Sequence, residues 1–264
     1  MLKRFIQNRM FLFMLSILLL GIVWELLSIW IGSSLIIPSP VQVIQTLFAL
    51  FQSPQIWNAL LSTFGKGLLG MVISLGLGIP IGFVIGLFPL LDPFFQPFLM
   101  ILRAMPIVSW LTSVLVLWGM GWQSPLFIVV VTLLPLIIYN VASGVRSVNR
   151  GLLEMAHVFR VSLWNRLTQI YLGSMFPFLF SSIQVSLGTM WKATIAAEFL
   201  IGDSGIGLRI AWHKTYLETD RVLAYTLLAV ACGIAFEYLL IGISSLPWFR
   251  RWKLNKNTYG DTKK

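Results

Sequence analysis

Charged residues and cysteine are scarce in this 264-residue chain. Asp, Glu, Lys and Arg make up 11% of it and hydrophobic residues 58%, whereas soluble domains are about a quarter charged and about half apolar. The single cysteine, Cys232, excludes an internal disulfide and a cysteine-cluster metal site. The composition therefore predicts an integral membrane protein.

Motifs for nucleotide binding and catalysis are also missing. The sequence has no P-loop (G-x-x-x-x-G-K followed by Ser or Thr), so any ATP that powers the protein is bound by another chain. His157 and His213 have no second ligand at metal-binding spacing, and we expect both at the surface. No nucleophile, acid–base pair or metal cluster occurs at a common membrane depth. These absences argue against a membrane-embedded enzyme and predict no catalytic residue, metal or cofactor on this chain.

Six apolar stretches are long enough to cross a bilayer, because its core of about 30 Å requires about 20 helical residues. They cover approximately residues 10–31, 60–88, 93–118, 124–145, 174–201 and 222–246. The basic start followed by an apolar run resembles a signal peptide, but the run is too long and lacks a small-residue cleavage site. We predict an all-α integral membrane protein with six transmembrane helices in a single domain.

Positive charge is concentrated at both ends of the chain and in the segment 146–173. The net charge is +10. Because cytoplasmic segments are enriched in Lys and Arg, we place the N-terminus, the segment 146–173 and the basic tail 247–264 in the cytoplasm. Cations placed in this way contact anionic lipid headgroups, and we expect no nucleic acid partner.

A short amphipathic helix is predicted between the first two spans. Ser39 can cap this helix, and Pro40 suits its first turn. Apolar residues then recur on one face and glutamines on another. The segment is too short to span a bilayer, so we expect it to lie along the outer interface of the membrane.

Small residues recur at every fourth position of the second span, a spacing that lets another helix approach backbone to backbone. The series is Gly70, Ser74, Gly78, Gly82 and Gly86. Pro80 lies within the series and favours a kink. The ridge serves either tight packing alone or a helix that slides or rocks during transport.

Charged groups inside the spans are candidate functional groups, because an ionisable side chain in lipid is costly unless it is paired or hydrated. Lys192 lies near the middle of the fifth span, with Trp191 beside it and Glu198 further on. Lys192 either lines a path for an anionic or polar solute or pairs with a glutamate on a neighbouring helix. For Glu25 and Glu237, near helix ends, we expect structural pairing.

A charged residue also lies deep in the third span. Arg103 is too far from the inner end to be a boundary residue unless the helix starts late, and Pro106 favours a broken or late-starting helix. The residues assigned to the predicted translocation path are Arg103, Pro106, Trp191, Lys192 and Glu198.

The segment 146–173 is the longest break in the apolar sequence, and it contains four arginines. Apolar residues recur in it at helical spacing, which predicts a short amphipathic helix. They are Leu152, Leu153, Ala156 and Phe159. A second short helix around 163–172 can follow. Two such helices present an apolar knob with a basic rim, which fits a hydrophobic groove on a soluble protein.

The same segment resembles the "EAA" loop of permease subunits of bacterial ABC importers. The matching residues are Glu154-Met155-Ala156, Arg160-Val161-Ser162, Trp164, Arg166, Ile170, Leu172 and Pro177. Other segments resemble the branch that handles sulfonates, taurine, nitrate, bicarbonate and thiamine-precursor pyrimidines. They are Pro38-Ser39-Pro40, the glycines from Gly78 to Gly86, Arg103-Ala104-Met105-Pro106, Trp191 with Ala197-Glu198, and Ser204-Gly205-Ile206-Gly207. The resemblance covers nearly the whole chain.

This resemblance implies a type I ABC importer (MetI-like) permease fold and a multi-pass protein of the bacterial inner membrane. The implied partners are a second copy of the chain, two cytoplasmic ABC ATPases that bind ATP and Mg, an external solute-binding protein and membrane lipid. The segment 146–173 would be the coupling loop, and its helix at 154–159 would be seated in each ATPase. The implied coupling residues are Glu154, Met155, Ala156, His157, Phe159, Arg160 and Arg166.

Two positions depart from the family pattern. The usual glycine six residues after Glu154 is Arg160, and the usual proline after Leu172 is Gly173. If that glycine serves a left-handed turn between two loop helices, Arg160 costs roughly 1 kcal/mol or more. Alternatively, the first loop helix continues and Arg160 adds a cation that faces the ATPase.

A secondary carrier driven by an ion gradient is the alternative function. Lys192, Glu198 and Arg103 would then form its charge relay. Such carriers often contain internal repeats, and we find none in this sequence. Co-purification with a stoichiometric ATPase supports the importer, whereas transport by the chain alone supports the carrier.

Overall fold

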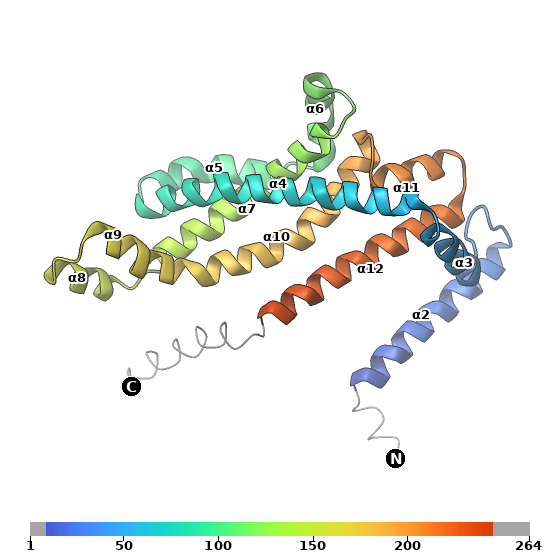
Figure 1. Ribbon diagram of the computed structural model, residues 1–264, viewed down its shortest axis with the longest axis horizontal. Helices are drawn as coiled ribbons and strands as arrows, with labels where there is room; N and C mark the ends of the chain where they lie inside the picture. Colours follow the sequence, from blue (N-terminus) through green and yellow to red (C-terminus); the bar gives the residue numbers. More distant parts are fainter. Residues whose placement is uncertain (1–8, 245–264) are drawn as a thin grey trace, which may run out of the picture.

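The computed structural model describes residues 9–244 of the chain, and within that range it contains helices and no strands (Figure 1). This confirms the predicted all-α class. Residues 1–8 and the predicted basic tail 247–264 lie outside the described residues. The predicted cytoplasmic position of both ends of the chain therefore stays a prediction.

Long apolar helices confirm five of the six predicted spans within the described range. They are α2 (Arg9–Ile31), α4 (Pro54–Leu87), α7 (Gln123–Arg146), α10 (Leu172–Ile201) and α12 (Thr219–Ser244). Each contains a stretch long and apolar enough to cross a membrane. In Figure 1, α4, α7 and α10 run beside one another along the long axis of the molecule.

The predicted third span, 93–118, consists of two helical pieces that meet at an angle of 100°. The pieces are α5 (Leu91–Ala104) and, after a break, the 3-10 turn η1 (Ile107–Trp110) with α6 (Leu111–Trp118). Pro106 lacks a backbone N–H and disfavours helical geometry at the residue before it, and Met105 accordingly has an extended backbone. The third span is therefore a bent pair of helices, and the broken helix expected at Pro106 is confirmed.

The core of the bundle lies where α4 and α10 pack against α7. The small residues of the ridge on α4 are all buried. A Cβ atom at Gly82 would lie 2.6 Å from the carbonyl oxygen of Ile138, and one at Gly70 would lie 2.6 Å from a methyl carbon of Val129. The predicted close approach of a second helix is confirmed, and that helix is α7. α4 continues without a break through Pro80, and the kink expected there stays a prediction.

Short helices form one end of the molecule, where α3 (Pro40–Phe51) and α11 (Ile206–Thr215) both pack against α12 (Figure 1). The hydroxyl of Ser39 accepts a hydrogen bond from the Gln42 N–H at 3.2 Å, which confirms the predicted cap of α3. α3 packs mainly against α12. The position of this end at the outer membrane interface stays a prediction.

The opposite end is formed by the segment 146–173. It contains α8 (Arg150–Val158), the single turn α9 (Leu163–Asn165) and the π-helical turn η2 (Arg166–Tyr171). α9 and η2 continue directly into α10, so Leu163–Ile201 is one helical stretch. The predicted helix around 163–172 is therefore present, but it continues into α10 and does not end as a short helix of the loop.

Candidate functional site

The helix α8 begins and ends at residues that fix its position in the loop. The side-chain carbonyl oxygen of Asn149 accepts a hydrogen bond from the Gly151 N–H at 2.8 Å and caps the start. After the last turn, Arg160 has a positive φ of 49°, a left-handed conformation that costs a residue with a Cβ about 1–2 kcal/mol. The left-handed turn expected from the family pattern is confirmed, and the alternative of a continuing helix was wrong.

Arg166 ties the end of α8 to the start of the long helical stretch. Its guanidinium donates hydrogen bonds to the carbonyl oxygens of Ala156 at 3.1 Å and Val161 at 3.0 Å. The last carbonyl groups of a helix lack helical partners and carry partial negative charge, so a cation there is stabilising. Arg166 therefore positions α8 from within the loop.

Apolar side chains cover the outward face of this loop. Phe159, Val158 and Leu163 are each 75% exposed and Trp164 is 73% exposed, which is costly in water unless a partner covers them. Ala156, which was predicted on the outward apolar face, is fully buried. The other predicted coupling residues are exposed; they are Glu154, Met155, His157 and Arg160.

A groove of about 680 Å³ lies beside this apolar face, between α8 and η2. Glu154, His157 and Arg166 line it together with leucines of both elements. The structure thus brings six of the seven predicted coupling residues to an open surface or to this groove, and it places the seventh, Ala156, beneath them.

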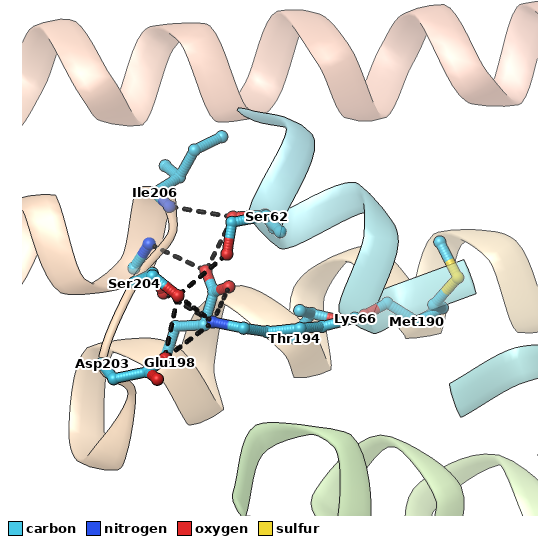
Figure 2. A network of polar contacts seen from close by, with 10 residues as sticks. Ser62, Lys66, Met190, Thr194, Glu198, Asp203, Ser204 and Ile206 are labelled. Carbon is cyan, nitrogen blue, oxygen red and sulfur yellow. Dashed lines mark hydrogen bonds and ion pairs between the residues drawn. The ribbon is translucent and has the colours of Figure 1, made fainter. Parts of the chain in front are cut away.

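The predicted path residue Glu198 lies at the centre of a buried polar network near the other end of α10 (Figure 2). Its side chain is fully buried, and Lys66 of α4 forms an ion pair with it at 3.2 Å. Thr63 donates a hydrogen bond to the other carboxylate oxygen at 2.7 Å. The Gly207 N–H, at the start of α11, donates to that same oxygen at 3.2 Å. Glu198 therefore joins α4, α10 and α11.

The ammonium group of Lys66 also holds the turn between α10 and α11. It donates to the carbonyl and hydroxyl oxygens of Ser204, both at 2.8 Å, and lies 3.3 Å from a carboxylate oxygen of Asp203. Partial burial acts to raise the pKa of Asp203, but the hydrogen bond from Ser204 and the charge of Lys66 outweigh it, so that this pKa lies below its ordinary value. The turn is thus held by ionised groups.

Gly205 in this turn leaves room for the Glu198 carboxylate. It has a φ of +105°, and a Cβ atom built on it would lie 2.0 Å from an oxygen of Glu198. A side chain at this position would therefore displace Glu198 from the network. The glycines in Ser204–Gly207, one of the segments that resemble the permease family, thus have a structural explanation.

Trp191 and Lys192 point to different surroundings although they are neighbours in α10. The Trp191 indole is buried and donates a hydrogen bond to the carbonyl oxygen of Ala229 in α12 at 2.8 Å. Lys192 is exposed and lines a groove between α10, α11 and α12. In the part of the chain that the structure describes, Lys192 forms no ion pair, so the alternative in which it pairs with a glutamate is not found there. Glu198 pairs with Lys66 instead.

Three further predictions concern charged groups and a histidine. Neither Glu25 nor Glu237 forms an ion pair within residues 9–244, and the structural pairing expected for them stays a prediction. His213 is 8% exposed and stacks on Tyr225, whereas it was expected at the surface. The reason is that α11 folds back onto α12.

The remaining path residues lie at the break between α5 and η1. Arg103 is exposed in the last turn of α5, and its guanidinium lies 5.5 Å from the ring centroid of Tyr139 in α7. Pro106 is exposed two residues beyond α5. Arg103 and Pro106 therefore lie together, apart from Glu198 in its buried network.

Lys66 is the residue that sequence reasoning missed. It lies inside the predicted span 60–88, so the rule that singled out Lys192 applied to it equally. Its partners are 132 and 137 residues away along the chain, and no local pattern connects them.

Comparison with known proteins identifies relatives over most of the chain. The family described as "Binding-protein-dependent transport system inner membrane component" matches residues 78–243. The taurine transport system permease protein of Escherichia coli (strain K12) is 25% identical over 240 residues, covering 87% of this chain and 86% of the relative. The nitrate import permease protein of Synechocystis sp. is 26% identical over 246 residues, covering 88% and 86%.

A solved structure shares the fold. An inward-facing form of the MetNI methionine ABC transporter contains a chain that matches with a TM-score of 0.55 and 20% sequence identity. The match covers 72% of this chain and 92% of that chain. The predicted MetI-like fold is confirmed by this likeness.

Proposed function

This chain belongs to the family of binding-protein-dependent transport system inner membrane components, and from that premise we propose that its segment 146–173 is the element that couples an ABC importer to its ATPases. The chain is the membrane-spanning permease subunit of such an importer and is a multi-pass protein of the inner membrane. It is not an enzyme, because ATP is hydrolysed by a separate subunit.

The complete transporter contains, in this proposal, two copies of the chain, two cytoplasmic ATPases and an external solute-binding protein. ATP and Mg are bound by the ATPases. Membrane lipid covers the remaining apolar surface, of which α2 contributes a large part.

The exposed apolar face of the loop is the observation that carries the proposal. Phe159, Val158 and Trp164 are exposed at the end of the molecule that the loop forms, and Phe159 and Val158 lie outside the helices that are long and apolar enough to span a membrane. In this proposal a groove on the ATPase covers them. Arg166 fixes α8 to the helical stretch that becomes α10. Movement of the ATPases would therefore be transmitted to a membrane helix, and the path between the two copies would open alternately to the two sides.

The solute is small and is polar or anionic. Lys192 and Arg103 are cations exposed on membrane-spanning elements, and such groups favour anions. Pro106, Trp191 and Glu198 complete the proposed path set, with Glu198 and Trp191 acting as structural supports because both are buried and hydrogen-bonded. Relatives named for the transport of sulfonates, nitrate and bicarbonate agree with an anionic solute, and the relative named for taurine, a zwitterion, agrees with a polar one.

Replacement of Glu154 and Phe159 by alanine tests the coupling loop. We expect the double variant to insert into the membrane normally but to lose most of the co-purifying ATPase, because Phe159 supplies a large exposed apolar contact. Trp212→Ala is the matched control, since Trp212 is an exposed aromatic residue on α11 at the other end. If the double variant still assembled with the ATPase and transported solute normally, the assignment of the coupling loop would be wrong.

A further inference from the structure

A groove of about 520 Å³ lies on the surface of the single chain, between α10, α11 and α12. Its walls are largely apolar and include Trp191, Ile195, Phe199, Val230 and Ile234. Lys192 of α10 and Glu237 of α12 line the same groove, and both side chains are exposed. The groove therefore carries one cation and one anion on an apolar surface.

Neither charge is neutralised by the described part of the chain. Lys192 and Glu237 form no ion pair with each other or with any other residue between 9 and 244. Lys192 precedes Ile201, the last residue of α10, by nine residues, which is roughly 14 Å along the helix axis. A cation at that depth is costly unless it is paired or hydrated. Lipid tails cannot neutralise it, so hydrocarbon alone does not complete this surface.

The two charges are about one helical turn apart along the groove. A Cβ atom at Gly188 would lie 3.2 Å from a carboxylate oxygen of Glu237, so this carboxylate is level with Gly188. Lys192 is the fourth residue after Gly188, which places its Cα about 6 Å further along the α10 axis. The flexible four-carbon stem of a lysine can cover this difference in height. The cation of one groove can therefore meet the carboxylate of another groove that stands beside it at the same depth.

Opposite charges on one surface make that surface complementary to a second copy of itself. In a two-fold symmetric contact, residue i of one copy meets residue j of the other, and j meets i. Lys192 would then lie against the partner subunit's Glu237, and Glu237 against the partner subunit's Lys192. We infer that the groove between α10, α11 and α12 faces the second copy of the chain, and that two such ion pairs join the copies.

This inference rests on the proposed function, in which the solute path lies between two copies and Lys192 belongs to it. Two grooves that face each other enclose a space between the copies, and the two ion pairs cross that space. The pairs neutralise Lys192 while the path holds no solute. The contact surface of the dimer is thus also a wall of the path.

The test uses two differently tagged forms of the full chain, co-expressed with the ATPase. Lys192→Glu places two carboxylates in the groove, and Glu237→Lys places two ammonium groups there. Each variant alone sets like charges opposite each other, which opposes association, whereas a mixed dimer restores both ion pairs. We expect tandem affinity purification to recover at least about tenfold more of the mixed dimer than of either homodimer, and transport to return only in the mixed complex.

A matched control and a second measurement accompany this test. Lys214→Glu reverses an exposed cation of α11 that does not line the groove, and it should form homodimers as the wild type does. The second measurement needs no charge reversal. In the background Cys232→Ser, one copy with Lys192→Cys and one with Glu237→Cys should be joined into a dimer by a short bis-maleimide cross-linker.

Three results would overturn the inference. The first is that homodimers of both charge variants are as abundant as the mixed dimer. The second is that the double variant Lys192→Glu/Glu237→Lys recovers dimers while the mixed pair does not, which indicates an ion pair within one chain. The third is the absence of the cross-linked dimer.

The wild-type complex is measured in parallel to separate this inference from the proposed function. A wild-type chain that forms no dimer, or that recovers no ATPase, would count against the proposed function. A wild-type dimer that does not depend on Lys192 and Glu237 would count against this inference alone.

Discussion

At the scale of single residues, Lys66 holds together groups from three parts of the chain. Its ammonium group contacts Glu198 in α10 and Asp203 and Ser204 in the following turn. Both members of the Lys66–Glu198 pair are almost fully buried. A buried pair is not strongly stabilising in itself, but removal of one partner leaves an uncompensated charge.

Lys66→Met should therefore destabilise the folded protein by about 3–5 kcal/mol, because the Glu198 carboxylate is left buried without its counter-ion. Thermal unfolding of the purified protein measures this. The double variant Lys66→Met/Glu198→Gln should recover a large part of the loss, since no net charge remains buried. A Lys66→Met protein as stable as the wild type would show that Glu198 does not depend on Lys66.

Arg160 is the second residue whose conformation has an energetic consequence. Because its φ is 49°, replacement by glycine should stabilise the loop by about 1 kcal/mol. Hydrogen exchange of the α8 amides in the purified protein should slow by about fivefold. His157→Gly, in the regular part of the same helix, should have the opposite effect, a loss of roughly 0.5–1 kcal/mol. Equal effects of the two substitutions would contradict a strained Arg160.

At the scale of helices, the contact between α4 and α7 depends on the absence of side chains. Gly82→Ala should destabilise the protein by about 1–3 kcal/mol, because the new Cβ atom would lie 2.6 Å from the backbone oxygen of Ile138. Gly76→Ala is the matched control in the same helix, since nothing lies within 4 Å of its Cβ position. Alanine should be neutral or slightly stabilising there, because it favours helix more than glycine does. Thermal unfolding that responds equally to both would disprove the contact.

The features of single helices that were predicted correctly each leave a recognisable pattern within a short stretch of the sequence. The ridge on α4 is visible in the four-residue spacing, and the break before η1 is visible in Pro106. The π-helical turn, the clamp by Arg166 and the inward position of Ala156 were not predicted. They depend on how α8 packs against the beginning of the long helical stretch, and hydrophobic periodicity contains no information about that contact.

At the scale of the whole molecule, the number of spans followed from hydropathy, whereas the pairing of charges did not. An apolar stretch is recognised from its own composition, so each predicted span overlaps an apolar helix or, for the third, a bent pair of helices, although α4 begins six residues before the predicted span. Lys66 and Glu198 meet only because α4 and α10 both pack in the bundle core. Lys192 and Glu198 looked equivalent in the sequence, yet one lies in an open groove and the other in a closed network.

The orientation of the molecule across the membrane gives a prediction at this scale. The background for this experiment is the variant Cys232→Ser, which has no cysteine. In that background, the cysteine of Trp164→Cys should react with a membrane-impermeant thiol reagent only in inside-out vesicles. A cysteine at Tyr216, near the end of α11, should react only in right-side-out vesicles, because the two exposed residues lie at opposite ends of the bundle. Reaction of the Trp164 position from outside would reverse the assigned orientation and remove the loop from the ATPases.

The continuous stretch Leu163–Ile201 has a mechanical consequence. It is a helix of roughly 60 Å, with the proposed coupling loop at one end and the buried Glu198 network at the other. Its regular hydrogen bonding is interrupted at the π turn near its beginning and at Pro177. Bending or rotation at these two places would absorb part of a displacement of the loop, and the rest would reach the Glu198 network.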